Sequence, residues 1–358
     1  MSIRCFRSAS VAVGLLMAFG LSACQAIVVT PSPTTTTTTT TPSPLLIPVG
    51  VHPARMAITP DGTKAYVVNR GYYSVAGSVS VINTATNTVS ATITVGDAPA
   101  SIAITPDGAK AYVVNGGNIP SGDGVASVSV INTATNTVSA TIAVGTIPDG
   151  VAITPNGAFA YVANVGDGTV AGSVSVINTA TNTVSATIAV GAFPASIAIT
   201  PDGTKAYVAN ANSQSVSIIS TVTNTVSATI TGITSPQKVV ITPDGTKAYV
   251  VNSGQPDTVS VITTATNTVS AVITGFKEQS AMAITPDGTK VYVVTGQYNV
   301  RDVRIIDTAT NAVSVFSTSY GVPYTWISIT PSGDKAYIIY GANSSGDYDG
   351  KVTVVDIP

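Results

Sequence analysis

Residues 59–69 read TPDGTKAYVVN, and the same words return through the rest of the chain. The tetrapeptide TPDG, or a one-letter variant of it, begins at Thr59, Thr105, Thr154, Thr200, Thr242, Thr285 and Thr330. Successive copies are 46, 49, 46, 42, 43 and 45 residues apart. A period of this length is typical of the four-stranded blades of a propeller rather than of shorter solenoid units. Seven copies therefore predict seven blades.

Residues 99–144 show the predicted plan of one blade. Strands are expected at 102–105, 110–115, 127–132 and 137–144, each short and bounded by turn residues. In the first turn Pro106 presets φ, Asp107 bonds its own backbone and Gly108 accepts the left-handed conformation. The repeated TPDG is therefore interpreted as a turn, and we predict an all-β, seven-bladed β-propeller of four-stranded antiparallel blades.

One tyrosine recurs at the same place in the second strand of every copy. A residue type that is repeated in every blade is expected to fill the core, where an aromatic side chain contributes most. The seven residues are Tyr66, Tyr112, Tyr161, Tyr207, Tyr249, Tyr292 and Tyr337.

The words around these tyrosines, AYVVN, AYVAN and VYVVT, resemble the YVTN family of β-propeller repeats. That family is found in bacterial envelope proteins and archaeal surface-layer proteins. The resemblance extends over residues 45–358, and it implies a propeller fold and a place at the cell envelope. It implies no particular activity, because the family's name describes its second strand.

The two ends of the repeat region complement each other. The last copy ends after a strand at 351–356 and lacks a fourth strand, whereas residues 45–50, LLIPVG, match the end of a fourth strand such as IAVG at 142–145. A closed ring leaves no edge strand to pair with a neighbour, whereas a linear solenoid needs polar caps. We therefore predict that an N-terminal strand completes the last blade.

Residues 1–23 have the features of a lipoprotein-type signal peptide. Arg4 and Arg7 precede an apolar run at 11–21 that is too short to span a bilayer. The following LSAC resembles the lipobox of bacterial lipoproteins, which implies that Cys24 becomes the N-terminus and carries lipid. An ordinary secretory leader with an incidental Cys24 is the alternative. Residues 24–44 are then the lipidated cysteine and a Thr/Pro/Ser-rich stalk. The expected location is extracytoplasmic, with lipid anchoring to the cell membrane or outer membrane.

The charge composition does not indicate a basic surface for binding nucleic acid. The chain has 15 basic and 17 acidic residues, and only 9% of its residues are charged. Binding to nucleic acid needs many basic groups on one face, and here the lysines mark the repeat instead. Six of them occupy one position of the motif: Lys64, Lys110, Lys205, Lys247, Lys290 and Lys335.

The alternation of strand direction assigns the loops to two faces. The constant words TPDG and TATNT fall on one face, and the variable loops fall on the opposite face, which we call the variable-loop face. Those loops are residues 70–77, 116–126, 165–172, 211–215, 253–258, 296–302 and 341–350. Function lies more often in variable loops on a rigid scaffold than in the repeated core.

The most informative departures from the repeat are near the central channel. The first-strand position held by Ser101 and Ser196 is occupied elsewhere by Arg55, Gly150, Lys238, Ala281 and, allowing one inserted residue, Trp326. A mouth that holds an acidic or sugar-like ligand is predicted to contain Arg55, Lys238, Trp326, Tyr324, Tyr72 and Tyr73. Asp149 joins this set as a channel acid or base beside Lys238. The alternative is a set of solvated loop residues with one aromatic at the rim.

Several kinds of chemistry find no support in the sequence. His52 is the single histidine, so no histidine-based metal or haem site is expected, and we predict no cofactor, no metal and no catalytic residue set. Glu278 is the single glutamate and has no evident carboxylate partner for glycoside hydrolysis. Aspartates in Gly-rich loops are candidates either for calcium or for turns: Asp123, Asp167, Asp347 and Asp349.

The sequence leaves three classes of function open. The first is a non-enzymatic binding or display module whose partner is an envelope polysaccharide, peptide or protein. The second is a propeller-borne hydrolase, lyase or oxidoreductase with its site at the channel mouth, since one fold hosts many activities. The third is a structural component of a surface layer.

Overall fold

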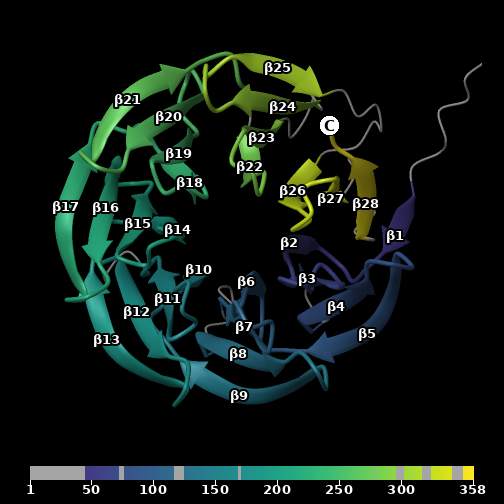
Figure 1. The fold of residues 1–358 in the computed structure, drawn as a ribbon. Helices are drawn as coiled ribbons and strands as arrows, with labels where there is room; N and C mark the ends of the chain where they lie inside the picture. Colours follow the sequence, from purple (N-terminus) through teal and green to yellow (C-terminus); the bar gives the residue numbers. More distant parts are fainter. Residues whose placement is uncertain are drawn as a thin grey trace, which may run out of the picture. The chain divides into compact units, whose positions relative to one another are not determined.

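A computed structural model describes residues 45–71, 76–116, 125–167, 171–277, 279–295, 302–316, 324–340 and 350–358. Its 28 strands form seven four-stranded antiparallel sheets arranged in a ring (Figure 1), so the predicted seven-bladed β-propeller is confirmed. All strands lie in the unit Pro44–Pro358, and the unit Met1–Ser43 is outside the described residues. Over the described ranges, no helix has the length and apolar character needed to cross a membrane.

Each blade contributes one strand at each distance from the ring centre. The innermost strands are β2 (Pro53–Ile58), β6 (Pro99–Ile104), β10 (Pro148–Ile153), β14 (Pro194–Ile199), β18 (Pro236–Ile241), β22 (Gln279–Ile284) and β26 (Tyr324–Ile329). The second strands are β3 (Lys64–Asn69), β7 (Lys110–Asn115), β11 (Phe159–Asn164), β15 (Lys205–Asn210), β19 (Lys247–Asn252), β23 (Lys290–Thr295) and β27 (Lys335–Tyr340). The third strands are β4 (Ser78–Asn83), β8 (Ser127–Asn132), β12 (Ser173–Asn178), β16 (Ser215–Ser220), β20 (Thr258–Thr263), β24 (Asp302–Asp307) and β28 (Lys351–Asp356). The outermost strands are β5 (Thr88–Thr94), β9 (Thr137–Ala143), β13 (Thr183–Ala189), β17 (Thr225–Thr231), β21 (Thr268–Ile273), β25 (Val313–Phe316) and β1 (Leu46–Pro48).

The innermost strand is longer than the sequence predicts. In the second blade it begins at Pro99 rather than at residue 102, because the register with β7 shifts between Pro99 and Ser101. This β-bulge inserts Ala100 and lets pairing continue to Asn115. Proline is tolerated there because the first residue of a strand need not donate to the ladder.

The TPDG segment is a self-bonded turn. The Thr59 hydroxyl donates to the Asp61 carboxylate at 2.5 Å, and the Thr59 amide donates to the Lys64 carbonyl at 2.9 Å. Gly62 has a φ of 73°, which glycine adopts without strain. The Thr84 hydroxyl in the TATNT turn donates to the Gly62 carbonyl at 2.6 Å, so both constant turns lie on one face, as predicted.

The core lies between neighbouring blades. Tyr66, Val79 and Ile93 of the first blade pack against Ile102 and Val113 of the second. The seven repeated tyrosines are buried, as predicted, with at most 1% of each residue exposed. The hydroxyls of six of them, all but Tyr292, bond to an asparagine of the next blade, and that of Tyr161, for example, donates to the Asn224 side-chain oxygen at 2.6 Å. The tyrosines therefore join blades as well as filling the core.

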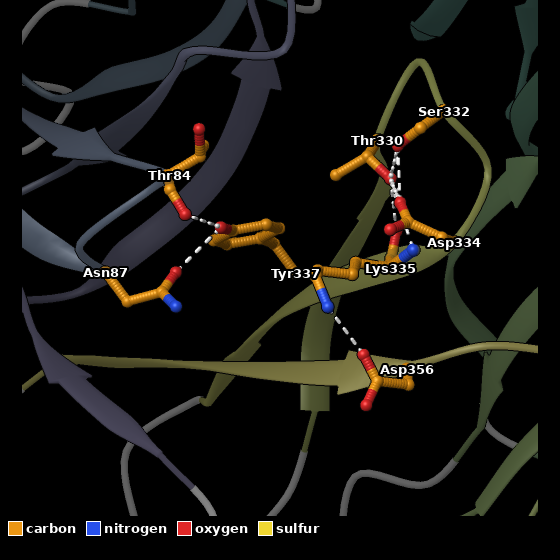
Figure 2. Close-up of polar contacts among 8 residues, drawn as sticks. All are labelled: Thr84, Asn87, Thr330, Ser332, Asp334, Lys335, Tyr337 and Asp356. Atoms are coloured by element: carbon orange, nitrogen blue, oxygen red, sulfur yellow. Dashed lines mark hydrogen bonds and ion pairs between the residues drawn. The ribbon is translucent and has the colours of Figure 1, made fainter.

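The ring closes as predicted, because the N-terminal strand β1 pairs with β28 and completes the last blade (Figure 1). Ile47 of β1 lies opposite Val352, is 2% exposed and packs in one cluster with Met56 of the first blade. Figure 2 shows that Tyr337 donates to the Asn87 side-chain oxygen, at 2.8 Å. The last blade therefore contacts the first through the same tyrosine bond that joins other neighbouring blades.

The junction of β28 and β1 in the last blade, which we call the seam, lacks one hydrogen bond that other neighbouring blades have, the bond from the repeated tyrosine. Strands β28 and β1 come from opposite ends of the chain, so no TATNT turn joins them. The Lys290 ammonium donates instead to the Pro358 carbonyl at 2.5 Å, whereas the equivalent lysines of four other blades donate to the first threonine carbonyl of that turn in the next blade: Lys64, Lys110, Lys205 and Lys247. The buried Tyr292 hydroxyl finds no hydrogen-bond partner among the described residues.

Candidate functional site in the central channel

The innermost strands surround the centre of the ring (Figure 1), and each contacts the innermost strands of both neighbouring blades. The residue after each β-bulge falls at an equivalent register in every blade: Arg55 opposite Val68, Ser101 opposite Val114, Gly150 opposite Ala163, Ser196 opposite Ala209, Lys238 opposite Val251, Ala281 opposite Val294 and Trp326 opposite Ile339. The seven residues that the sequence aligned therefore occupy the same position in their blades. Trp326 joins it without the inserted residue that the sequence comparison allowed, because Tyr324 takes the place of the first-strand proline.

Small residues at four of these positions leave room for the large ones. Ser101, Gly150 and Ser196 occupy the consecutive second, third and fourth blades, and Ala281 lies between Lys238 and Trp326 in the order of the blades. A Cβ at Gly150 would lie 3.3 Å from the Ser196 Cα, so the third and fourth blades approach closely there. The channel space is left to Arg55, Lys238 and Trp326.

The strongest contact in the channel joins the first and third blades. The Arg55 guanidinium donates to both carboxylate oxygens of Asp149 at 3.0 Å and to the Asp149 carbonyl at 2.7 Å. The side chains are 11% and 30% exposed, respectively. Asp149 reaches this position because it is the extra residue of the bulge in β10. A partly buried, charge-assisted pair of this kind fixes both side chains.

The charges around Asp149 keep it ionised. Burial acts to raise the pKa of Asp149, but the charges of Arg55 and Lys238 and the hydrogen bonds from Arg55 act against burial. Arg70, at the end of β3, lowers the pKa further. The net result is a pKa below the usual value of 3.8 for aspartate. Asp149 therefore acts as a fixed negative charge at neutral pH.

Trp326 brings the two cations together. The Arg55 guanidinium carbon and the Lys238 ammonium nitrogen each lie 5.4 Å from the centre of the Trp326 ring. Both distances are within the range of cation–π attraction. The indole N–H donates to the Met56 carbonyl at 3.2 Å and to the Ser328 hydroxyl at 3.1 Å. These bonds hold the ring against the first blade.

The Lys238 amine has an unusual environment. Burial and, to a smaller extent, the Arg55 charge lower its pKa, the Asp149 charge acts in the opposite direction, and the net result is a fall from 10.5 to about 7. Within the described ranges, its ammonium makes no hydrogen bond or ion pair, and it lies over the Trp326 ring. A lysine with so low a pKa can exchange a proton near neutral pH.

The structure brings Arg55, Asp149, Lys238 and Trp326 together; we call these four residues the channel cluster. Tyr324 does not join them, because its side chain is 1% exposed and packs edge-on against Tyr340 with ring centres 5.4 Å apart. The prediction that Tyr324 lines the mouth is therefore wrong, since it replaces a buried proline. The other predicted residues Tyr72, Tyr73 and Cys24 lie outside the described residues.

The remaining polar candidates lie elsewhere. His52 precedes Pro53 with a φ of 53°, and its carbonyl accepts a hydrogen bond from the Arg70 amide at 2.9 Å. Burial and the Arg70 charge lower the His52 pKa. Asp167 is exposed, and the described part of the chain has no group of three histidines, cysteines or acidic residues able to hold a metal ion. Asp123, Asp347, Asp349 and Glu278 lie outside that part.

The sequence reasoning missed two polar features. Arg70 influences the pKa of both Asp149 and His52, although it was assigned only to a variable loop. Asp302 and Arg304 form an ion pair at 3.4 Å in the sixth blade. The signal for this pair was the change from SVSVIN to DVRIID in the third strand, which departs from the repeat as clearly as the channel residues do.

Comparison with known proteins supports the fold. A family model described as a YNCE-like beta-propeller matches residues 167–255. Hydrazine synthase from Kuenenia stuttgartiensis is similar in structure, with a TM-score of 0.71, 23% identity, and coverage of 86% of this chain and 96% of that one. The β-propeller domain of Myceliophteria thermophila Cps50 (Swd1) has a TM-score of 0.70 at 11% identity, with coverage of 88% and 99%. No curated protein matches the sequence. The chain is a β-propeller repeat protein, and likeness at these identities extends to the fold alone.

Proposed function

We propose that this propeller is a lipid-anchored cell-envelope protein that binds an envelope polysaccharide, peptide or protein at its variable-loop face. The fold suits a binding or interaction module in general, because a rigid ring presents many loops on one side. The observation that carries the proposal is the channel cluster, in which four residues that break the repeat meet from the first, third, fifth and seventh blades. Elsewhere the same strand position carries small residues.

The location in the envelope rests on two sequence resemblances. The lipobox-like LSAC supports lipidation at Cys24, and the YVTN-like second strands support a place among envelope propellers. The Thr/Pro/Ser tract at 30–44 supports a stalk that holds the ring away from a membrane. Cys24→Ser should move the protein from the membrane fraction to the soluble fraction. Unchanged fractionation would contradict the anchor.

The binding role is tested with a ligand screen. The purified propeller is screened by thermal shift against envelope polysaccharides, peptidoglycan fragments and peptides, and a ligand is expected to raise the melting temperature. Arg55→Ala and Trp326→Leu should each abolish that rise. Lys277→Met is the matched control, because Lys277 is an exposed cation in the connection between β21 and β22, on the same face but outside the cluster. Equal shifts in all variants would contradict a channel site.

A hydrolase or lyase is the second candidate, and the Lys238 amine favours it. An amine with a pKa of about 7 can act as a general base near neutral pH, and Asp149 lies close enough to influence its charge. Turnover of ester, lactone or sugar substrates that is lost in Lys238→Met and in Asp149→Asn would support an enzyme. Ordered self-assembly of the soluble propeller would support the third class, a surface-layer component.

A further inference from the structure

The channel cluster has an excess of positive charge. The positive charge of Arg55 is neutralised by Asp149, because the guanidinium donates to both carboxylate oxygens. Lys238 has no such partner in the described part of the chain, and the neighbouring channel positions on β14 and β22 are the neutral Ser196 and Ala281. With Lys238 protonated, the cluster therefore has a net charge of one positive unit.

The charged groups are placed where a ligand can reach them. Arg55 and Lys238 each lie two residues after the first residue of β2 or β18, and Asp149 lies one residue after the first residue of β10. These strands begin at the variable-loop face, so the cluster lies about 7 Å inside it at roughly 3.3 Å per residue. Trp326 is only partly buried and offers an apolar surface beside the two cations.

We infer that the channel cluster binds the carboxylate of an acidic sugar or similar monoanion, with Lys238 as the ion-pair partner of that carboxylate. This inference rests on the proposed binding function and names its ligand class. A single negative charge matches the excess of one positive charge, whereas a phosphate group, with a charge of about −1.5 to −2 at neutral pH, would add repulsion from Asp149. The Trp326 ring suits the C–H face of a sugar.

Binding should be coupled to protonation of Lys238. An incoming carboxylate favours the ammonium form, so the amine takes a proton from the solvent while the ligand stays ionised. The charged groups that act on Lys238 are Arg55 and Asp149, and Trp326 is the aromatic side chain beside it. Because burial and the Arg55 charge lower its pKa to about 7 in the free protein, part of a proton should be taken up per carboxylate bound near neutral pH.

The test is calorimetric titration of the full chain with sodium glucuronate, repeated in two buffers of different ionisation enthalpy. Saturable binding with net uptake of protons is expected near neutral pH. Glucose, the neutral analogue, should not bind, and inorganic phosphate should bind more weakly. Lys238→Met should weaken glucuronate binding by about tenfold or more, because it removes one partner of a desolvated charge pair. Lys238→Arg should bind without proton uptake, and Lys277→Met should behave as the wild type.

The outcomes separate this inference from the function on which it rests. Glucuronate binding that is unchanged in Lys238→Met overturns the inference. Phosphate binding as tight as glucuronate binding overturns the carboxylate class. A neutral glycan or peptide that binds when no carboxylate ligand does leaves the proposed function standing and overturns the inference. If no ligand of any class binds, both are overturned.

Discussion

Replacing Lys238 with methionine should stabilise the propeller at low pH and lose that advantage as the pH rises. Methionine has a similar length and no charge, so it removes the ammonium without opening a large cavity. In the wild type, burial and the nearby Arg55 disfavour the charged amine and lower its pKa from 10.5 to about 7. The unfolded chain therefore binds this proton more tightly than the folded chain does.

The size of the effect follows from that shift. One pKa unit corresponds to about 1.4 kcal/mol, so a fall from 10.5 to about 7 sets an upper limit near 5 kcal/mol. Lys238 is only partly buried, and solvent screening reduces the penalty to about 2–3 kcal/mol. Loss of the contact with the Trp326 ring costs the variant about 0.5–1 kcal/mol. Lys238→Met should therefore be about 2 kcal/mol more stable below pH 7.

The assay is urea unfolding followed by far-UV circular dichroism between pH 6 and pH 9.5. The wild type should gain stability as the pH rises from 7 toward 10.5, where the unfolded chain also loses the proton. The variant should lack this gain, so the two proteins converge. The upper limit of the range stays below the ordinary tyrosine pKa of 10.0, above which the unfolded chain would lose tyrosine protons that the folded protein keeps, since burial raises the pKa of tyrosines such as Tyr161 to about 12.

Two results would refute the reasoning. If wild type and Lys238→Met changed in parallel from pH 6 to pH 9.5, Lys238 would not be the titrating group. If the wild type were the more stable protein at pH 6, the ammonium would have a compensating partner. Lys277→Met is the control: this lysine is exposed, so its replacement should leave the pH dependence of the wild type unchanged.

Two further predictions concern the ring. Deleting residues 45–50 removes β1 and the buried Ile47, exposes β28 as an edge, and should lower the melting temperature by about 5–10 °C in calorimetry; an unchanged melting curve would contradict ring closure by the N-terminal strand. Tyr161→Phe should cost about 1–2 kcal/mol in urea unfolding because it breaks the bond to Asn224, whereas Tyr292→Phe should change stability by less than about 0.5 kcal/mol because that hydroxyl has no hydrogen-bond partner in the described part of the chain. Equal losses in the two tyrosine variants would show that the seam does not leave Tyr292 unsatisfied.

Most of the fold could be predicted from the sequence, because each blade repeats the same local rules. Strand alternation and turn chemistry act over a few residues, so TPDG and the repeated tyrosines predicted the turns, the core and the number of blades. The innermost strand was predicted too short at its start. A β-bulge there inserts Ala100 and extends pairing to Pro99, and bulges are set by the partner strand rather than by local pattern.

The candidate site was predictable only as a set of departures from the repeat. The sequence placed Arg55, Lys238 and Trp326 at one strand position, and the register confirms that placement. It also placed Tyr324 at the mouth, where the structure instead buries it in the place of a proline. Whether a side chain faces the channel or the neighbouring blade depends on how two sheets pack. The sequence of a single strand does not determine that packing.

The sequence alone determined seven blades, the constant turns and the strand that closes the ring, since these depend on residues close together in the chain or on a repeated word. Only the tertiary structure decided which of the residues that depart from the repeat lie in contact. Arg55 and Asp149 are 94 residues apart and pair because the ring places the first and third blades around one channel. The lowered pKa of Lys238 has the same origin, because desolvation and the nearby Arg55 charge, which together outweigh the opposing Asp149 charge, exist only once the blades enclose it.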